Sequence, residues 1–389
     1  MDKYLYWLDR IKGLGPVSKR NLMEAFGSAR EVYLGKEKLI RYILDEKKWK
    51  LFETAKTEEP EQAFEQLMKQ NIGMVAYGQN RYPGKLIHIP DPPFCIYYKG
   101  KLPEENLPSV AVIGARECSA YGEYIARELG ESLGSRGIQV ISGMARGIDG
   151  ISQNAALKAG GSSYGVMGCG VDICYPKSNQ IVYDTLLKQG GVLSSYPPGT
   201  TPQANLFPPR NRIVSGLADV LVVIEARQRS GTSITVEMAL EQGREIYAVP
   251  GRITDRLSDG CNKMIKEGAH VFLSPEDFLL DLKALLPEAM ESVENIRRHS
   301  VERKGADVEI PNFAQGKEDI GKPTMQEQIL QVLDFYPKSL EEIEERLYKG
   351  FELRLRTEEL TRQLMQLCLL GAVRQDSPGW FSCMPTRLG

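Results

Sequence analysis

The 389-residue chain is predicted to be an α/β protein with a doubly wound, mostly parallel central sheet. Between residues 107 and 250, short apolar runs alternate with amphipathic segments, the pattern of strands covered on both faces. Both ends of the chain instead have apolar residues at helical spacing. We therefore expect an N-terminal helical domain (1–75), a Rossmann-like domain (76–285), a linker (286–322) and a C-terminal winged-helix domain (323–389).

The first segment should contain two helices joined by a glycine turn. Leu5, Leu8 and Ile11 recur at helical spacing, and Gly13 opens the run GLGPVSKR, in which Pro16 suits a first helical turn. This arrangement predicts a helix-hairpin-helix or SAM-like domain. Two interpretations stay open: the turn amides face a phosphate, or the helices form a small bundle that binds no ligand.

The middle segment (76–285) begins with a proline-rich stretch at 76–106, in which short strands are expected. Strands are expected at 110–113, 139–142, 163–167, 191–194, 220–225 and 245–249. Helices are expected at 121–136, at a segment ending near 155–159, and at 236–242. Short apolar strands alternating with helices predict parallel strands joined by helical crossovers.

The last segment follows a polar stretch at 286–322 that has the composition of a linker. Helices are expected at 325–333, 340–347 and 358–369, followed by a hairpin that turns at Ser377. Three helices and a hairpin make a winged helix. Residues 323–389 contain eight Lys and Arg against ten Asp and Glu, whereas duplex-binding modules are usually basic. We expect a protein contact or a supporting role, although Arg354, Arg356 and Arg362 offer a local basic patch.

Composition argues against metal, disulfide and histidine chemistry. Seven scattered cysteines include no CxxC pair, which indicates a reducing compartment such as the cytoplasm. The three histidines have no companion motif, so no catalytic residue and no cofactor is expected. Asp149 and Asp172 lack a third ligand at useful spacing, and we expect them to accept turn hydrogen bonds. No apolar run is long enough to span a membrane.

The residues that follow the predicted strands carry the candidate site. Ligands bind beyond the carboxyl ends of parallel strands, and glycines, hydroxyls and cations recur there. Because the formal net charge is −2, a polyanion site must concentrate its cations locally. The candidate binding residues are Gly114, Arg116, Ser142, Gly143, Arg146, Gly147, Gly168, Gly170, Lys177, Asn179, Phe207, Arg210, Asn211, Arg212, Ser230, Gly231 and Thr232.

The ligand predicted for these residues is single-stranded DNA. Neither the GxGxxG dinucleotide fingerprint nor a P-loop is present, so the usual signals for NAD and ATP are missing. Arg210 and Arg212 can hold successive phosphates while Phe207 offers a stacking face. Alanine at both arginines is expected to weaken binding and leave the fold intact. The alternative is that one arginine pairs inside the fold and Phe207 belongs to the core.

Six motifs, in a fixed order along the chain, resemble those of one protein family. They run from VIGAR (112–116) with SAYG (119–122), through SGMARGID (142–149), GCGVDICYPKSN (168–179) and FPPRNRIVSGL (207–217), to SGT (230–232) and AVPG (248–251). The series resembles the DNA-processing protein A (DprA/Smf) family over about residues 82–275. The resemblance implies a homodimer, formed through the Rossmann-like domain, that binds incoming single-stranded DNA and helps load the RecA recombinase during natural transformation. It assigns the DNA pocket to Arg116, Lys177, Phe207, Arg210, Asn211, Arg212 and the turn at 230–232. Many members have an Ala-His pair after the Gly-Ile-Asp motif, and this sequence has no histidine there.

Two rival functions stay open. An enzyme is possible, because nucleotide phosphoribohydrolases with a similar fold use a glutamate three residues after a Gly-Thr pair. Here that position is Thr235, and Glu237 lies about 200° further around a helix. A protein-interaction scaffold that retains only the fold is the other rival, and the clustered cations argue against it.

Overall fold

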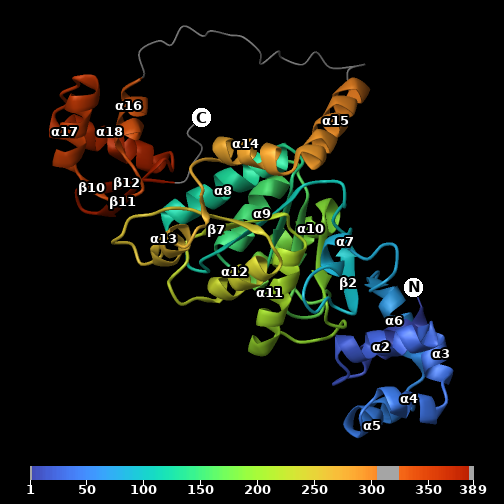
Figure 1. The fold of residues 1–389 in the computed structure, drawn as a ribbon. Helices are drawn as coiled ribbons and strands as arrows, with labels where there is room; N and C mark the ends of the chain where they lie inside the picture. The colour runs from blue at the N-terminus through green and yellow to red at the C-terminus, as the bar shows by residue number, and fades with distance from the viewer. Residues whose placement is uncertain (1, 305–323, 385–389) are drawn as a thin grey trace. The chain divides into compact units, whose positions relative to one another are not determined.

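The computed structural model describes residues 2–304 and 324–384, and its contacts divide the chain into two compact units. The first unit holds the N-terminal helices and the large sheet, and the second holds the C-terminal elements (Figure 1). Residues 305–322 of the expected linker (286–322) lie outside the described residues. Its beginning differs from the expectation, because Pro287–Lys304 form helix α15. Met290 and Val293 are buried, so this stretch has an apolar side.

Six helices precede the sheet: α1 (Lys3–Arg10), α2 (Pro16–Phe26), α3 (Ala29–Leu34), α4 (Glu37–Ile43), α5 (Glu46–Ala55) and α6 (Pro60–Lys69). Their core contains fully buried Leu8, Leu22 and Phe52. The turn before α2 needs Gly13, whose φ is +83°. The basic residues after this turn contact protein, since Lys19 pairs with Asp9 at 2.9 Å and Arg20 donates to the Pro92 carbonyl. These contacts favour the interpretation of the hairpin as a scaffold without a ligand.

The large sheet has nine strands in the order β1-β2-β6-β5-β4-β3-β7-β8-β9. The strands from β6 to β9 in that order pair in parallel, and β1 and β2 pair antiparallel at one side. This arrangement confirms the expected α/β class with a mostly parallel sheet. The bounds are β1 (Gly73–Ala76), β2 (Cys95–Gly100), β3 (Ser109–Gly114), β4 (Gln139–Ser142), β5 (Ser163–Val166), β6 (Gly191–Ser194), β7 (Val220–Ile224), β8 (Glu245–Ala248) and β9 (His270–Val271).

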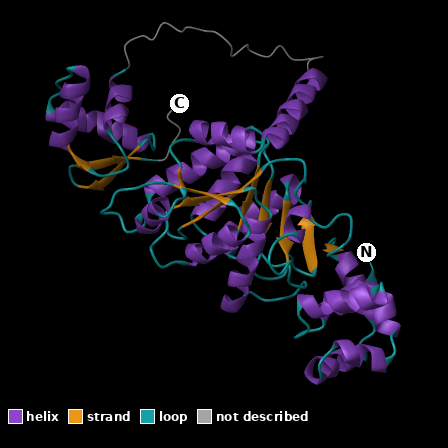
Figure 2. Ribbon diagram, in the orientation of Figure 1, coloured by secondary structure: helices purple, strands orange, loops and turns teal. Residues whose placement is uncertain are grey.

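Helices cover both faces of this sheet (Figure 2). Successive residues of one strand point to opposite faces, and neighbours such as Val192 and Leu193 belong to two separate apolar cores. This explains why the strands are continuously apolar and do not alternate with polar residues. The covering helices are α7 (Gly84–Ile87), α8 (Ala120–Ser135), α9 (Ile148–Lys158), α10 (Gln180–Gln189), α11 (Phe207–Gly216), α12 (Gly231–Glu241), α13 (Asp259–Lys266) and α14 (Pro275–Leu285), with short 3₁₀ turns η1 (Lys177–Asn179) and η2 (Ala204–Leu206).

The strand order creates a switch point at β3. Successive strands β4, β5 and β6 lie on one side of β3, while β7, β8 and β9 lie on the other. Connections leave β3 and β7 in opposite directions there, which opens a crevice at the carboxyl ends of the strands. Gly114 ends β3 where an added Cβ would collide with the Ile224 carbonyl of β7.

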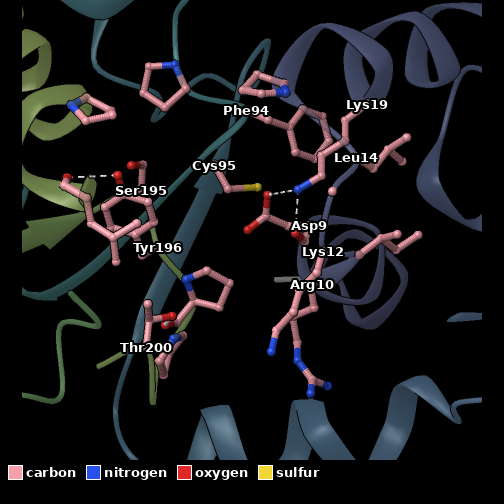
Figure 3. A pocket seen from close by; sticks show the side chains of 18 of the residues that line it. Asp9, Arg10, Lys12, Leu14, Lys19, Phe94, Cys95, Ser195, Tyr196 and Thr200 are labelled. Atoms are coloured by element: carbon pink, nitrogen blue, oxygen red, sulfur yellow. Dashed lines mark hydrogen bonds and ion pairs between the residues drawn. The ribbon is translucent and has the colours of Figure 1, made fainter. Parts of the chain in front are cut away.

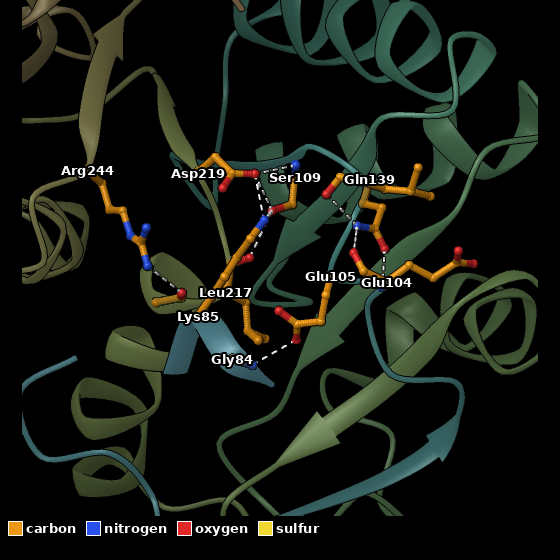
Figure 4. Close-up of polar contacts among 11 residues, drawn as sticks. Gly84, Lys85, Glu104, Glu105, Ser109, Gln139, Leu217, Asp219 and Arg244 are labelled. Carbon is orange, nitrogen blue, oxygen red and sulfur yellow. Dashed lines mark hydrogen bonds and ion pairs between the residues drawn. The ribbon is translucent and has the colours of Figure 1, made fainter. Parts of the chain in front are cut away.

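A polar cluster fastens the opposite, amino ends of the strands. Asp219 accepts hydrogen bonds from Lys85 Nζ at 2.6 Å and from the Ser109 amide at 2.8 Å (Figure 4). Lys85 also donates to Ser109 Oγ at 2.7 Å. These contacts tie α7 to the starts of β3 and β7, so a partly buried carboxylate holds three segments in register.

The second unit has its own apolar core. Its elements are α16 (Met325–Val332), β10 (Lys338–Ser339), α17 (Leu340–Phe351), α18 (Thr357–Leu369), β11 (Val373–Ser377) and β12 (Trp380–Cys383). Thr324 and Ser339 form capping boxes at the starts of α16 and α17. The expected three helices and hairpin are therefore present.

No helix in the described residues is long and apolar enough to cross a bilayer.

Asp219→Ala should lower the free energy of unfolding by about 2–4 kcal/mol, because it leaves the Ser109 amide without its acceptor and the Lys85 ammonium without its counter-charge. Urea unfolding followed by circular dichroism measures the change. Asp184→Ala is the control, since this exposed carboxylate accepts from Gln180 on the same helix and from no other side chain in the described part of the chain. Equal losses in the two variants would show that the cluster adds no stability.

Candidate nucleic-acid interface

A cleft of about 520 Å³ opens at the carboxyl ends of β3, β4 and β7, at the switch point of the sheet. It brings together eight of the residues expected from the sequence, and these come from four separate loops and helix starts. They are Gly114, Arg116, Gly143, Phe207, Asn211, Ser230, Gly231 and Thr232. Thr235 also lines the cleft, whereas Glu237 is exposed and is not among the lining residues.

Two arginines line the cleft with exposed side chains. Gly114 of β3 pairs with Ile224 of β7, so the residues that follow these positions emerge at the same edge. Arg116 and Arg227 are those residues, and both are exposed. Neither makes a hydrogen bond or ion pair with any residue that the structure describes. Two guanidinium groups are therefore available for an anionic ligand.

The first turn of α12 is the second feature suited to an anion. Ser230 stands at the N-cap, but its side chain does not cap the helix. Its Oγ is buried and has no hydrogen-bond partner among the described residues. Gly231 and Thr232 follow, and a Cβ added at Gly231 would meet open space. The amides of this turn can therefore donate to a phosphate, which the helix dipole also favours.

The floor of the cleft is a buried pair of opposite charges. Asp149 accepts from the amides of Gly143 at 3.1 Å and Ala145 at 3.4 Å. Arg210 donates from Nη1 to the Gly143 carbonyl at 2.6 Å and to the Val166 carbonyl. Burial raises the pKa of Asp149 and lowers the pKa of Arg210 to about 10, and the attraction between the two charges opposes both shifts.

Arg210 therefore stands elsewhere than the sequence led us to expect. Its side chain is only 4% exposed, so it supports the floor and offers no free fork to a strand. This is the alternative in which one arginine pairs inside the fold. The turn requires Gly143, because an added Cβ would lie 2.8 Å from Asp149 Oδ2 and 2.9 Å from Arg210 Nη2.

Arg212 also differs from the expectation, because it faces a second cavity on the other side of α11. Phe207 and Asn211 line the cleft, whereas Arg212 lines this larger cavity of about 1360 Å³. Arg212 Nη1 lies 3.2 Å from Asp91 Oδ2. Helix α11 thus separates the cleft from the second cavity, and Arg210 and Arg212 do not bind one DNA strand together.

The second cavity lies between the N-terminal helices and the loops that follow β6 (Figure 3). Lys19 donates to Asp9, and Tyr97 on β2 donates to the other oxygen of that carboxylate at 2.5 Å. Arg10 lies 3.8 Å from Glu58. Arg10, Lys19 and Arg212 each lie beside a carboxylate in this cavity. Lys12 also lines it and makes no ion pair among the described residues, so most but not all of its cations are matched.

The remaining expected residues stand around the cleft without lining it. Ser142 is buried and donates to the Val112 carbonyl, and the Gly170 amide donates to the Thr200 carbonyl. Asn179 donates to the carbonyls of Met144 and Ala145, so it fixes one loop against another. Arg146 and Lys177 are exposed. Two glycines allow close contacts: Gly147, with φ +71°, against the Ala115 carbonyl, and Gly168 against the Phe207 ring.

Asp172 accepts from the Gly199 amide at 3.0 Å. Together with the amides held by Asp149, this confirms the expectation that both carboxylates accept turn hydrogen bonds. Within residues 2–304 and 324–384, no group of three His, Cys, Asp or Glu is arranged to hold a metal ion.

Sequence reasoning missed Arg227, which lines the cleft. Candidate residues were sought just after the carboxyl end of each strand, and the same search after β7 would have found Arg227, which lies three residues beyond the end of that strand. Asp149 was noticed only as a turn residue. Its partnership with Arg210 joins positions 61 residues apart, and no local pattern signals it.

Comparisons with known proteins agree with this geometry. The family model for DNA recombination-mediator protein A matches residues 73–283. DNA processing protein DprA of Streptococcus pneumoniae is 42% identical over 202 residues, which cover 52% of this chain and 71% of that protein. DprA of Bacillus subtilis is 37% identical over 215 residues, covering 55% and 72%. The X-ray structure of Streptococcus pneumoniae DprA matches with a TM-score of 0.64 and 34% identity, covering 72% of this chain and 98% of that one.

Arg210→Ala should lower the free energy of unfolding by about 3–5 kcal/mol, because it leaves the Asp149 charge buried without its counter-charge. Arg212→Ala should cost about 1 kcal/mol or less, since its partner Asp91 is 71% exposed. Chemical unfolding of the two variants side by side tests this difference. If the two losses are equal, the floor does not depend on Arg210.

Proposed function

The chain belongs to the DNA recombination-mediator protein A family, and from this premise we propose that it binds single-stranded DNA in the cleft at β3, β4 and β7. One observation carries the proposal: two unpaired arginines and an uncapped helix start meet at the switch point of the sheet. The chain as a whole carries a formal net charge of −2. Positive charge is therefore concentrated where a sugar-phosphate backbone can lie.

A single strand suits this cleft better than a duplex. Phe207 lines the wall beside the cations, and an aromatic ring can stack on any unpaired base. Bases inside a duplex are already stacked and do not reach such a ring unless they are flipped out. Arg116 and Arg227 would then hold phosphates, with Ser230, Gly231 and Thr232 donating to the same backbone.

Further roles follow from the family resemblance. We propose that the bound strand is protected and passed to the RecA recombinase during natural transformation, in the cytoplasm. The free thiols of all seven cysteines are compatible with a reducing compartment. Arg146 and Lys177 are exposed near the cleft and are assigned to the outer path of the strand.

Catalysis is not part of the proposal. A phosphoribohydrolase of similar fold needs a carboxylate at the position of Thr235, which lines the cleft with a hydroxyl. Two carboxylates line the cleft: Asp149, whose oxygens accept from turn amides next to Arg210, and Glu117, which is exposed just after β3. The hydroxyl at Thr235 and the turn bonds of Asp149 support a binding protein over an enzyme.

We propose that the homodimer implied by the resemblance forms at the edge strand β9. Val271 on β9, Leu273 after it and Leu280 on α14 are exposed, Leu273 by 71% and Leu280 by 69%. An edge strand with exposed apolar side chains is a site for pairing with another chain. A second copy of the chain would cover these residues.

The C-terminal unit is proposed to contact protein or to support DNA binding weakly. Arg362 on α18 is held by Glu359 at 2.6 Å, and Arg354 stacks over the Tyr348 ring at 4.5 Å. Two of the three arginines of the expected basic patch therefore have partners within the unit. Glu359 offsets the charge of Arg362, whereas the Tyr348 ring leaves the charge of Arg354 in place.

Arg116→Ala and Arg227→Ala should each weaken binding of a single-stranded oligonucleotide about tenfold or more, because each removes a charged hydrogen-bond donor. The slope of log affinity against log salt should fall by about 0.7 for each phosphate that is no longer neutralised. Fluorescence anisotropy across a salt series measures both. Lys158→Ala is the control, since this exposed lysine ends α9 at the opposite edge of the sheet. Unchanged affinity in both arginine variants would refute the proposed site.

Leu273→Glu should convert a dimer into a monomer, because it places a charge within the proposed apolar contact. Light scattering coupled to size-exclusion chromatography measures the mass. Ile181→Glu on α10 is the matched control, with a side chain that is 77% exposed. A dimer that persists in Leu273→Glu, or that is lost equally in the control, would place the interface elsewhere.

A further inference from the structure

We propose that Tyr175 forms a stacking platform for one nucleobase beside the cleft, an inference that rests on the proposed function. Tyr175 is 45% exposed and precedes η1. Its ring centroid lies 5.7 Å from that of Phe207, with 41° between the ring planes. The two rings therefore form a continuous aromatic surface that leads from the cleft wall toward solvent.

Tyr175 is the freer ring of the pair. Phe207 is packed so closely on Gly168 that a Cβ added there would lie 2.7 Å from the ring. The Arg210 guanidinium lies 5.6 Å from the Phe207 centroid. With Tyr175 as a third neighbour, Phe207 has limited surface left for a base. The exposed part of Tyr175 is the larger remaining area on which a base can stack.

The loop that carries Tyr175 is held in place before any ligand arrives. Asn179 donates to the Met144 carbonyl at 3.0 Å and to the Ala145 carbonyl at 2.9 Å. Ala145 lines the cleft, so these bonds fix the loop to the cleft wall. A ring that is already positioned loses little conformational freedom on binding, which leaves more of the stacking energy as affinity.

Lys177 adds a cation two residues beyond the ring. It is exposed and has no partner among the residues that the structure describes. An aromatic face next to a free ammonium group matches the base and the phosphate of one nucleotide. The ligand class is therefore an unpaired base of a single strand, without sequence preference, since every base has a π-face.

Affinity for a thymidine oligonucleotide, compared with an abasic oligonucleotide of equal length, tests the inference. Tyr175→Leu should weaken binding of the thymidine strand about 5- to 100-fold and leave the abasic strand unchanged, because only the first has bases to stack. Tyr175→Phe should keep the affinity of the unaltered protein. Tyr42→Leu is the matched control, with a tyrosine 92% exposed on α4, and it should change neither affinity.

A second measurement distinguishes a loss of base stacking from a change in folding. The fluorescence of 2-aminopurine in the strand should be quenched by the unaltered protein and by Tyr175→Phe, and less by Tyr175→Leu. Equal losses on both strands would mean that Tyr175 only packs against Phe207, and this overturns the inference. So does an unchanged affinity in Tyr175→Leu while Arg116→Ala still loses binding, an outcome that leaves the proposed function standing. Absence of binding by the unaltered protein would overturn both.

Discussion

The buried pair of Asp149 and Arg210 is the interaction on which the cleft depends. Asp149 holds the amides of the turn after β4, and Arg210 donates to carbonyls at the ends of β4 and β5. These two buried charges thus fix two loops and the start of α11. Burying two charges is expensive, and it rarely adds stability compared with an apolar core. Its value here is positional, because the loops that it fixes form the floor of the cleft.

With the floor fixed by internal charges, the charges meant for a ligand can stay exposed. Arg116 and Arg227 emerge side by side because β3 and β7 pair from Val110 to Gly114 in register. The buried Arg210 also repels a further cation, as its interaction with Arg116 shows. A polyanion relieves this repulsion. In a protein with a net charge of −2, such local concentration of cations allows a strand to be bound without a generally basic surface.

The sequence predicted six of the nine strands closely and the site only in part. The bounds of those six agree within one residue, because buried parallel strands are continuous apolar runs bounded by glycine or polar residues, whereas β1, β2 and β9 were given no bounds. The predicted site differs from the structure at Arg210 and Arg212, which do not line the cleft. Both are arginines of one short motif, so the motif alone treats them as equals. Residues two apart on a helix are separated by about 200°, however, and cannot face one cleft. Which of them is buried depended on Asp149, a long-range partner.

Helix α12 shows how the unliganded cleft retains its capacity to bind. A helix start normally has its first amides capped by a side chain, and a buried hydroxyl normally has a partner. At Ser230 neither condition is met among the described residues, while Ser274, Thr324 and Ser339 cap their helices in the usual way. The same chain therefore uses the same residue type in two ways. Where the hydroxyl caps a helix it stabilises the fold, whereas at Ser230 it stays without a partner, which costs the fold a little stability and leaves the amides of this turn free for a phosphate.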